Sequence, residues 1–171
     1  MNPFKTPVFP ALLLCLLSAL PALAQHEAPV TAGTDANKAV VKRYIEEVLS
    51  AGRLEKLEEL ISPEFVDSTP EGPAVRGPEA VRIVQKRARE RFEGIRYTLD
   101  QLIAEGDKVV ARYIVLATLK ASDKSPAAGK SAEIAGMTIF RIVDGKIRET
   151  WIINDQIELF RQLGYTLTPP K

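Results

Sequence analysis

The sequence predicts an α+β domain in which three helices pack on a curved antiparallel sheet and a short helix ends the chain. Two observations predict this class. Apolar residues recur at a helical period of about 3.6 up to Gly94 and at the strand period of two after it. The predicted strands also follow one another with short connections, which favours an antiparallel meander with helices on one face. Of the 171 residues 46% are apolar, which is enough for a packed core.

Three helices are expected in the first half of the chain. The first begins at Asp35 and ends at Ala51-Gly52, where glycine is a common stop signal. A short second helix begins at Leu54 and ends at Ser62-Pro63. The third follows Gly77-Pro78, because proline is favoured in the first turn of a helix.

Four strands are expected in the second half. Each is rich in β-branched and aromatic residues and is bounded by turn signals; they span 95–104, 108–120, 132–143 and 147–154. Asp144-Gly145 predicts a tight hairpin turn, because this pair tolerates positive φ. Gly136, inside the third strand, indicates either a bend in the sheet or a close-packed position. A final helix is expected at Gln156–Leu163, closed by Gly164.

The N-terminal segment predicts export. Lys5 precedes a long apolar run, and Ala22-Leu23-Ala24 supplies small residues for cleavage. We therefore expect a signal peptide at 1–24 that is cleaved after Ala24, a flexible leader at 25–34, the folded domain at 35–164 and a tail at 165–171. The protein is then periplasmic or secreted. Cys15 is lost with the signal peptide, which excludes disulfides and cysteine chemistry from the mature chain.

The charge balance and the single histidine narrow the partners and the chemistry. The chain has 23 basic and 22 acidic residues, so it lacks the basic excess typical of proteins that bind nucleic acid or anionic membranes. We expect no nucleic-acid partner, and no membrane partner after signal cleavage. His26 lies in the leader, which excludes Ser-His-Asp triads and histidine-ligated zinc from the domain.

Four stretches, together with Trp151 and Asp155, carry a family resemblance. They are Asn37–Tyr44, Pro63–Asp67, Glu105–Tyr113 and Phe140–Ile147. From about Asp35 to Gly164 the chain resembles the SnoaL-like polyketide cyclase (ester-cyclase-like) family of the nuclear-transport-factor-two-like superfamily. The resemblance implies a cone-shaped fold with a pocket for a small hydrophobic ligand on the concave side of the sheet. It also implies a homodimer and an activity that uses no metal and no organic cofactor.

The resemblance further implies a catalytic aspartate, which matches Asp155. In polyketide cyclases of this type a pocket aspartate is the acid/base of an aldol ring closure. A period of two places Trp151 on the same strand face, where it would line the cavity beside the carboxylate. An apolar pocket raises the pKa of a carboxyl group and makes it a better base. Two structural alternatives stay open: Asp155 and Glu158 match a capping box for the last helix, and Trp151 is a core aromatic residue.

Further side chains are candidates for substrate binding. An aldol reaction needs a hydrogen-bond donor near the developing enolate oxygen, and Tyr44, Tyr113 and Asn154 are able to provide one. Asp67 either faces the pocket or forms an Asx-turn before Pro70. The predicted substrate-binding set is therefore Trp151, Tyr44, Tyr113, Asp67 and Asn154.

Two functions remain open at this point. The first is an exported isomerase, dehydratase or aldol-type cyclase that acts on a small hydrophobic carbonyl compound with Asp155 as acid/base. The second is a non-catalytic periplasmic module that binds a lipid-like ligand or a second copy of itself. The signal segment and the lack of a histidine in the domain favour the second function.

Overall fold

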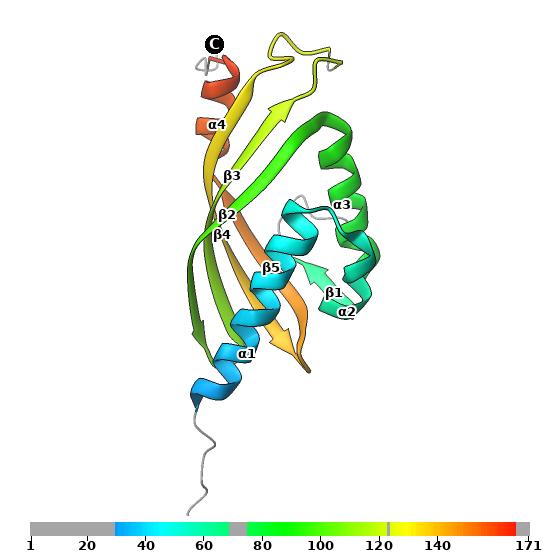
Figure 1. The fold of residues 1–171 in the computed structure, drawn as a ribbon, viewed down its shortest axis with the longest axis vertical. Helices are drawn as coiled ribbons and strands as arrows, with labels where there is room; N and C mark the ends of the chain where they lie inside the picture. The colour runs from blue at the N-terminus through cyan, green and yellow to red at the C-terminus, as the bar shows by residue number, and fades with distance from the viewer. Residues whose placement is uncertain (1–29, 69–74, 123, 167–171) are drawn as a thin grey trace, which may run out of the picture.

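Helices cover one face of a curved sheet. The computed structural model describes residues 30–68, 75–122 and 124–166. Within them, five strands form one mixed sheet in the order β1-β5-β4-β3-β2. Figure 1 shows α1 and α3 on the concave side of this sheet and α4 at one of its ends. The predicted α+β class is confirmed.

The N-terminal helices follow the predicted order with shifted bounds. α1 spans Val30–Arg43, so it begins five residues before the predicted start at Asp35, and it continues into a π-helical segment, η1, at Tyr44–Ser50. The short second helix is a 3₁₀ turn, η2 (Leu54–Lys56), followed by α2 (Leu57–Leu60).

α4 begins and ends where the sequence signals predicted, and α3 begins where they predicted. α3 ends at Arg91, before the predicted change of period at Gly94, because β2 already begins at Phe92. α3 spans Pro78–Arg91 with proline in its first turn, and α4 spans Gln156–Leu163. Gly164 ends α4 in a left-handed conformation, which glycine adopts at no steric cost.

Four strands form the predicted antiparallel meander. They are β2 (Phe92–Glu105), β3 (Lys108–Leu119), β4 (Ser131–Val143) and β5 (Lys146–Asn154). Asp144 and Gly145 both have positive φ and join β4 to β5 by the predicted tight turn.

The sheet contains a fifth strand that the sequence did not predict. β1 (Ile61–Asp67) runs parallel to β5, so the sheet is mixed rather than purely antiparallel. The strand holds Pro63, which interrupts a strand pattern because proline cannot donate to the ladder. β1 lies at the edge of the sheet, where a missing donor is tolerated, and its register with β5 is irregular between Ile61 and Val66.

The irregularities of the sheet come from bulges, and none of them lies at Gly136. β2 contains one extra residue between Glu93 and Arg96 and another between Leu99 and Gln101, and β5 contains one extra residue, Arg148. Such insertions bend and twist a strand. Gly136 pairs without interruption with Tyr113 on one side and Asn154 on the other. Of the two interpretations of this glycine, the structure shows the close-packed one.

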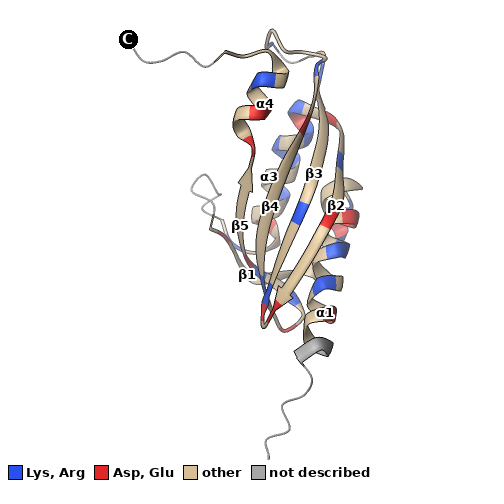
Figure 2. Ribbon diagram, turned by 90° about the vertical axis from the view of Figure 1, so that its left-hand side faces the viewer, with Lys and Arg blue, Asp and Glu red and all other residues tan. Residues whose placement is uncertain are grey.

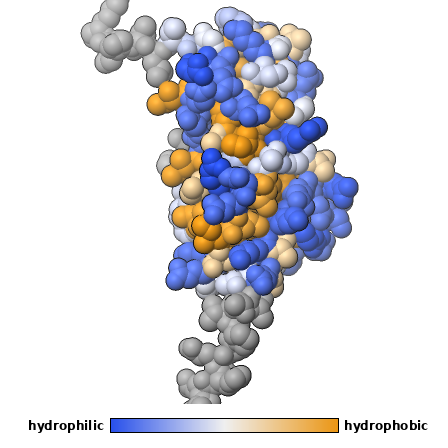
Figure 3. All heavy atoms as spheres, turned by 60° about the vertical axis from the view of Figure 1, so that its left-hand side comes forward, coloured by the Kyte–Doolittle hydropathy of each residue, from blue (hydrophilic) through white to orange (hydrophobic). Residues whose placement is uncertain are grey.

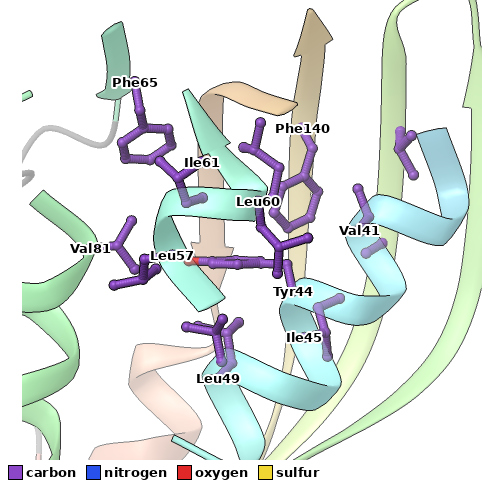
Figure 4. Close-up of a cluster of buried hydrophobic side chains, with 14 of the residues drawn as sticks. Val41, Tyr44, Ile45, Leu49, Leu57, Leu60, Ile61, Phe65, Val81 and Phe140 are labelled. Atoms are coloured by element: carbon purple, nitrogen blue, oxygen red, sulfur yellow. The ribbon is translucent and has the colours of Figure 1, made fainter. Parts of the chain in front are cut away.

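The main core lies between the helices and the concave face of the sheet, and a second, smaller cluster of buried residues includes Leu119 of β3 and Leu163 of α4. Figure 4 shows the centre of the main core, where Tyr44 and Phe140 meet edge to face with ring centroids 5.9 Å apart. The core also holds fully buried aliphatic residues from α1, η1, α2 and β1, among them Val41, Ile45, Val48, Leu57, Leu60 and Ile61. Burial of this apolar surface is the main stabilising term and holds the helices against the sheet.

Arg89 ties α3 to the end of η1. Its Nη2 donates to the carbonyl oxygens of Val48 and Leu49 at 3.2 and 2.8 Å. A cation is stabilising at a helix C-terminus, where the last carbonyl groups lack partners within the helix. This contact fixes the spacing between the two helices that form the roof of the cavity described below.

Some sequence predictions lie outside the described residues. They include the signal peptide at 1–24, the leader residues up to 29 that contain His26, and Pro70 of the proposed Asx-turn. In the part of the chain that the structure describes, no helix is both long enough and apolar enough to cross a membrane.

Candidate functional site

A cavity of about 150 Å³ lies between the concave face of the sheet and the helices η1 and α3. Its floor is formed by inward-facing residues of β2 to β5, and β1 forms one side. Val84 of α3 borders the cavity and is 39% exposed, so the cavity reaches the surface beside this helix. Figure 4 shows Phe65, Val81 and Leu49 around the ring of Tyr44 at this place.

The lining is unusually polar for a space inside a core. Apolar walls are contributed by residues such as Leu49, Phe65, Val81, Phe140 and Ile152. Polar side chains come from every strand and from both helices: Tyr44, Asp67, Gln85, Tyr97, Tyr113, Thr138, Thr150 and Asn154. A mostly enclosed pocket with several convergent polar groups is the usual form of a small-molecule site.

A hydrogen-bonded group crosses three strands at the floor of the cavity. The Tyr113 hydroxyl donates to Oδ1 of Asn154 at 3.1 Å and lies 3.0 Å from Oγ1 of Thr138. Because Tyr113 has one hydrogen to donate, the Thr138 hydroxyl donates to Tyr113. Gly136 lies beneath this group, and a Cβ there would collide with Oδ1 of Asn154 and the Tyr113 ring. The glycine therefore makes room for the polar group.

Three tyrosines of the cavity remain neutral donors at physiological pH. Burial, assisted by the nearby Tyr97, Asp67 and Tyr113, raises the pKa of Tyr44 well above its ordinary value. Burial likewise raises the pKa of Tyr97 and of Tyr113, although the hydrogen bond with Thr138 partly offsets the shift at Tyr113. The Tyr97 and Tyr113 rings meet edge to face at 5.2 Å.

One buried polar atom of the cavity lining lacks a protein partner. Oγ1 of Thr150, a residue 3% exposed, forms no hydrogen bond within the described residues. Gln85, which is 6% exposed, brings a side-chain amide to the same cavity. Buried polar groups are nearly always satisfied, so an unpaired hydroxyl beside a cavity indicates a polar ligand. The bond from Tyr113 uses only the oxygen of the Asn154 amide, which leaves its N–H groups available as well.

Asp67 carries the one carboxylate among the described residues that line this cavity. It ends β1, is half-buried and pairs with Thr150 of β5. Its charge contributes to the raised pKa of Tyr44, which lines the same cavity. Asp67 therefore faces the cavity, as one of its two interpretations predicted, while the Asx-turn before Pro70 lies outside the described residues.

Asp155 lies elsewhere. It is the N-cap of α4, where Oδ1 accepts the backbone N–H of Glu158 at 2.9 Å, and it is exposed. It borders a hollow on the outer face of the sheet rather than the cavity. The geometry is that of the predicted capping alternative.

Trp151 also lies outside the cavity. It pairs with Ile139, which is an outward-facing, exposed residue of β4, and direct cross-strand partners point to the same face. The prediction placed Trp151 on the face of Ile147 by counting in twos. The bulge at Arg148 breaks this count, so Thr150, Ile152 and Asn154 face the cavity instead. The expectation that Trp151 lines the cavity beside Asp155 is corrected on this ground.

The predicted residues Tyr44, Tyr113, Asp67 and Asn154 do line the cavity together. Four further polar residues line the cavity and were not predicted from the sequence: Gln85, Tyr97, Thr138 and Thr150. Gln85 interrupts the apolar stripe of α3, one helical turn after the buried Val81, and this polar residue on a buried face was a usable signal. Thr150 was not accessible to prediction, because its direction depends on the bulge.

A second cavity of about 270 Å³ lies farther along the concave face, under α4 and the end of α3. Tyr97 and Asn154 border both cavities. The other walls of the second cavity are apolar apart from Gln156, and no charged residue lines it among those that the structure describes. No cluster of three or more potential metal ligands occurs in the described residues.

The fold and the cavity define a small-molecule-binding domain of the nuclear-transport-factor-two-like type. The family model for SnoaL-like polyketide cyclases matches residues 39–163, so the chain belongs to this family. Among curated protein sequences none matches it significantly.

Solved structures agree with this assignment. The chain is 28% identical to TsrD from Streptomyces laurentii, with a TM-score of 0.67 over 76% of this chain and 96% of that one. It is 27% identical to IdmH, a candidate polyketide cyclase from Streptomyces antibioticus, with a TM-score of 0.67 over 75% and 99% of the two chains. An epoxide hydrolase of the LEH-like type from M. tuberculosis shares the fold at 14% identity and a TM-score of 0.62, covering 77% and 91%.

Proposed function

We propose that this protein catalyses proton transfer at a carbon next to a carbonyl group in a small hydrophobic compound, with Asp67 as acid/base. The observation that carries the proposal is the position of this carboxylate in a cavity whose other polar groups are neutral donors. Family membership supports a small-molecule substrate. The proposal moves the acid/base role from Asp155, which caps α4, to Asp67.

The chemistry follows from the groups present. The carboxylate of Asp67 takes a proton from the carbon next to the carbonyl, and the electron pair of that bond moves to the carbonyl oxygen. Neutral donors stabilise the resulting enolate; the Tyr44 hydroxyl and the amide N–H groups of Asn154 and Gln85 are suited to this. Where the substrate has a carbon–carbon double bond conjugated with the enolate, Asp67 then returns the proton to the far carbon of that system, the double bond shifts, and an isomer results. Where the enolate carbon attacks a second carbonyl, the proton goes to the new alkoxide, which gives an aldol product.

Hydrogen–deuterium exchange of 2-hexanone in D₂O, followed by NMR, tests this step without knowledge of the natural substrate. We expect the wild-type protein to accelerate exchange at the carbons next to the carbonyl. A general base contributes ~10²- to 10⁴-fold to such rates, so Asp67→Asn should lower the catalysed rate by at least ~10²-fold while the affinity for 2-hexanone stays nearly unchanged.

Asp155→Asn is the matched control. Asparagine caps helices as well as aspartate does, so the fold is retained and the charge alone is lost. Exchange should proceed at the wild-type rate in this variant. Loss of exchange in Asp155→Asn with full activity in Asp67→Asn would overturn the assignment. Tight binding with no exchange in the wild type would indicate the non-catalytic binding module.

We further propose that the protein forms a homodimer through the outer face of the sheet. This face carries exposed apolar side chains, with Ile153 at 77%, Met137 at 46% and Ile139 at 37% exposure. Figure 3 shows apolar surface on this side of the molecule, in patches that hydrophilic side chains separate. Figure 2 shows the strands of this face, which also carry charged residues; Arg112, which borders the outer hollow, is paired with Asp100. Large exposed apolar patches are typical of interaction surfaces.

We also propose that the protein is exported. The composition of residues 1–24 supports this, with one basic residue before an apolar run and small residues before Gln25. The intact mass of protein recovered from the periplasmic fraction or the medium of its host should correspond to a chain that begins at Gln25. A full-length mass in the cytoplasm would contradict export.

A further inference from the structure

We propose that the two cavities form one binding site for an amphiphilic carbonyl compound, whose carbonyl end occupies the polar cavity and whose hydrocarbon chain occupies the apolar one. This inference rests on the proposed function for the placement of the carbonyl end. The specificity-determining residues for chain length are then Ala117 and Ala132, which lie in the apolar cavity, far from the reacting group.

The size of the cavities is the first argument. Pockets that hold ordinary small ligands have volumes of ~300 to 1,000 Å³. The polar cavity, at about 150 Å³, and the apolar cavity, at about 270 Å³, each fall short of this range. Taken together they lie within it. A ligand that uses the polar groups and is buried to the usual extent therefore has to extend into the apolar cavity.

The contrast in lining is the second argument. The polar cavity contains the Asp67 carboxylate, three tyrosines, the Gln85 amide and the unpaired hydroxyl of Thr150. The apolar cavity is lined by aliphatic and aromatic residues of α3, β2, β3, β4 and α4, such as Phe92, Ile95, Val115, Ile134 and Leu159. A site divided in this way matches a ligand with one polar end and one apolar end. It would leave the polar groups of a uniformly polar ligand without partners.

The boundary between the cavities is the third argument. It consists of Tyr97 and Asn154, which border both spaces. Tyr97 is held at its backbone by Ser50, whose Oγ accepts its N–H at 2.9 Å, and Asn154 is held by Tyr113. Both boundary residues are therefore fixed by groups outside the apolar cavity.

Two small residues keep the apolar cavity open. Ala117 of β3 and Ala132 of β4 are direct cross-strand partners, and both point into it. Larger side chains at these neighbouring positions would fill the space between the sheet and Leu159 of α4. The pair therefore sets how much of a hydrocarbon chain the site accepts.

The dissociation constants of 2-butanone, 2-heptanone and 2-undecanone, measured by NMR titration, test the inference. Burial of one methylene group is worth about fourfold in affinity, so affinity should rise steeply along the series in the wild type. Ala132→Leu should reduce the affinity for 2-undecanone by at least ~tenfold and change that for 2-butanone by less than ~twofold. Ala117→Leu, a second variant in the same cavity, should act in the same way.

Ala135→Leu provides the matched control. Ala135 is on β4, three residues from Ala132, but it points to the outer face and is exposed. It should leave all three affinities unchanged. Urea unfolding of each variant checks that the fold is retained.

The outcomes separate the inference from the proposed function. An affinity that does not depend on chain length, or a uniform loss for all three ketones in both leucine variants, would overturn the two-cavity site even if deuterium exchange occurs. Absence of exchange with the chain-length dependence intact would overturn the catalytic role of Asp67 and leave the two-cavity site standing.

Discussion

The two faces of the sheet depart from the usual distribution of side chains in opposite directions. The concave face buries polar residues, of which Thr138 and Thr150 are each 3% exposed, whereas the outer face exposes apolar ones such as Ile153. Polar side chains are mostly exposed and large apolar ones mostly buried in folded proteins. The concave face buries polar side chains because they surround a cavity. The outer face exposes apolar side chains on the surface of the molecule. The difference teaches that the two faces of one sheet can be specialised independently, and it agrees with the small-molecule site and the dimer surface proposed above.

On the concave face, the largest effect is expected from the addition of one carbon atom at Gly136. Gly136→Ala should lower the free energy of unfolding by about 1–3 kcal/mol, because the new Cβ forces Tyr113 and Asn154 apart. The affinity for 2-hexanone should fall as well, since the polar floor is displaced. Urea unfolding and NMR titration measure the two effects.

Gly33→Ala is the control for this substitution. A Cβ at Gly33 meets no atom within 4 Å, and the residue lies in α1. Alanine should raise the free energy of unfolding there by ~0.5–1 kcal/mol, because glycine weakens a helix interior. If both variants were equally stable, the close packing at Gly136 would not constrain the site.

On the outer face, a new charge should weaken the proposed dimer. Ile153→Lys places an ammonium group on the proposed dimer surface at the most exposed apolar side chain given above. It should weaken self-association by about tenfold or more, because a buried isoleucine contributes ~1.5–3 kcal/mol. Sedimentation velocity over a concentration series measures this. The control is the affinity for 2-hexanone, which should be unchanged; a monomeric wild type at high concentration would contradict the dimer.

The buried tyrosines of the concave face make the free energy of unfolding depend on pH. The unfolded chain loses tyrosine protons at pH ~10, whereas the raised pKa of Tyr44 keeps its proton bound in the folded state. The free energy of unfolding therefore falls as the pH rises above 10, by about 1.4 kcal/mol per pH unit for each such tyrosine. Between pH 9 and 11, Tyr44→Phe should lose about 1.4 kcal/mol less than the wild type in urea unfolding. Parallel losses in the two proteins would show that the Tyr44 hydroxyl is solvated.

The smallest effect is expected at Asp155. Removal of an N-cap costs about 1 kcal/mol, so Asp155→Ala should lower the midpoint of urea unfolding slightly and leave ligand affinity unchanged. Asp155→Asn should restore most of the stability. A large loss of affinity in Asp155→Ala would place this carboxylate at the ligand despite its position on the outer face.

Much of the fold follows from sequence periodicity. The exceptions depend on strand pairing, which a local pattern does not reveal. The strands β2 to β5, the helix α3 and the turn at Asp144-Gly145 are carried by local signals, and all are present. β1 was missed because its pairing with β5 is a contact between distant segments, and Pro63 masks the local strand pattern.

The candidate site was predicted in part for the same reason. Tyr44, Tyr113, Asp67 and Asn154 meet at the cavity as expected for residues on a concave face. Trp151 was placed on the wrong face, since a count in twos is valid only in an unbroken strand. Asp155 matched both a catalytic motif and a capping pattern, and only the hydrogen bond to Glu158 distinguishes them in space.

The bulge at Arg148 determines which side chains of β5 face the cavity. With the bulge present, Thr150, Ile152 and Asn154 point inward. A pairing that took Arg148 into a regular ladder would slip the rest of the strand by one position and exchange them for Trp151 and Ile153, which would make the cavity lining apolar. The polarity of the cavity thus depends on one bulge in β5, without any change to the helices.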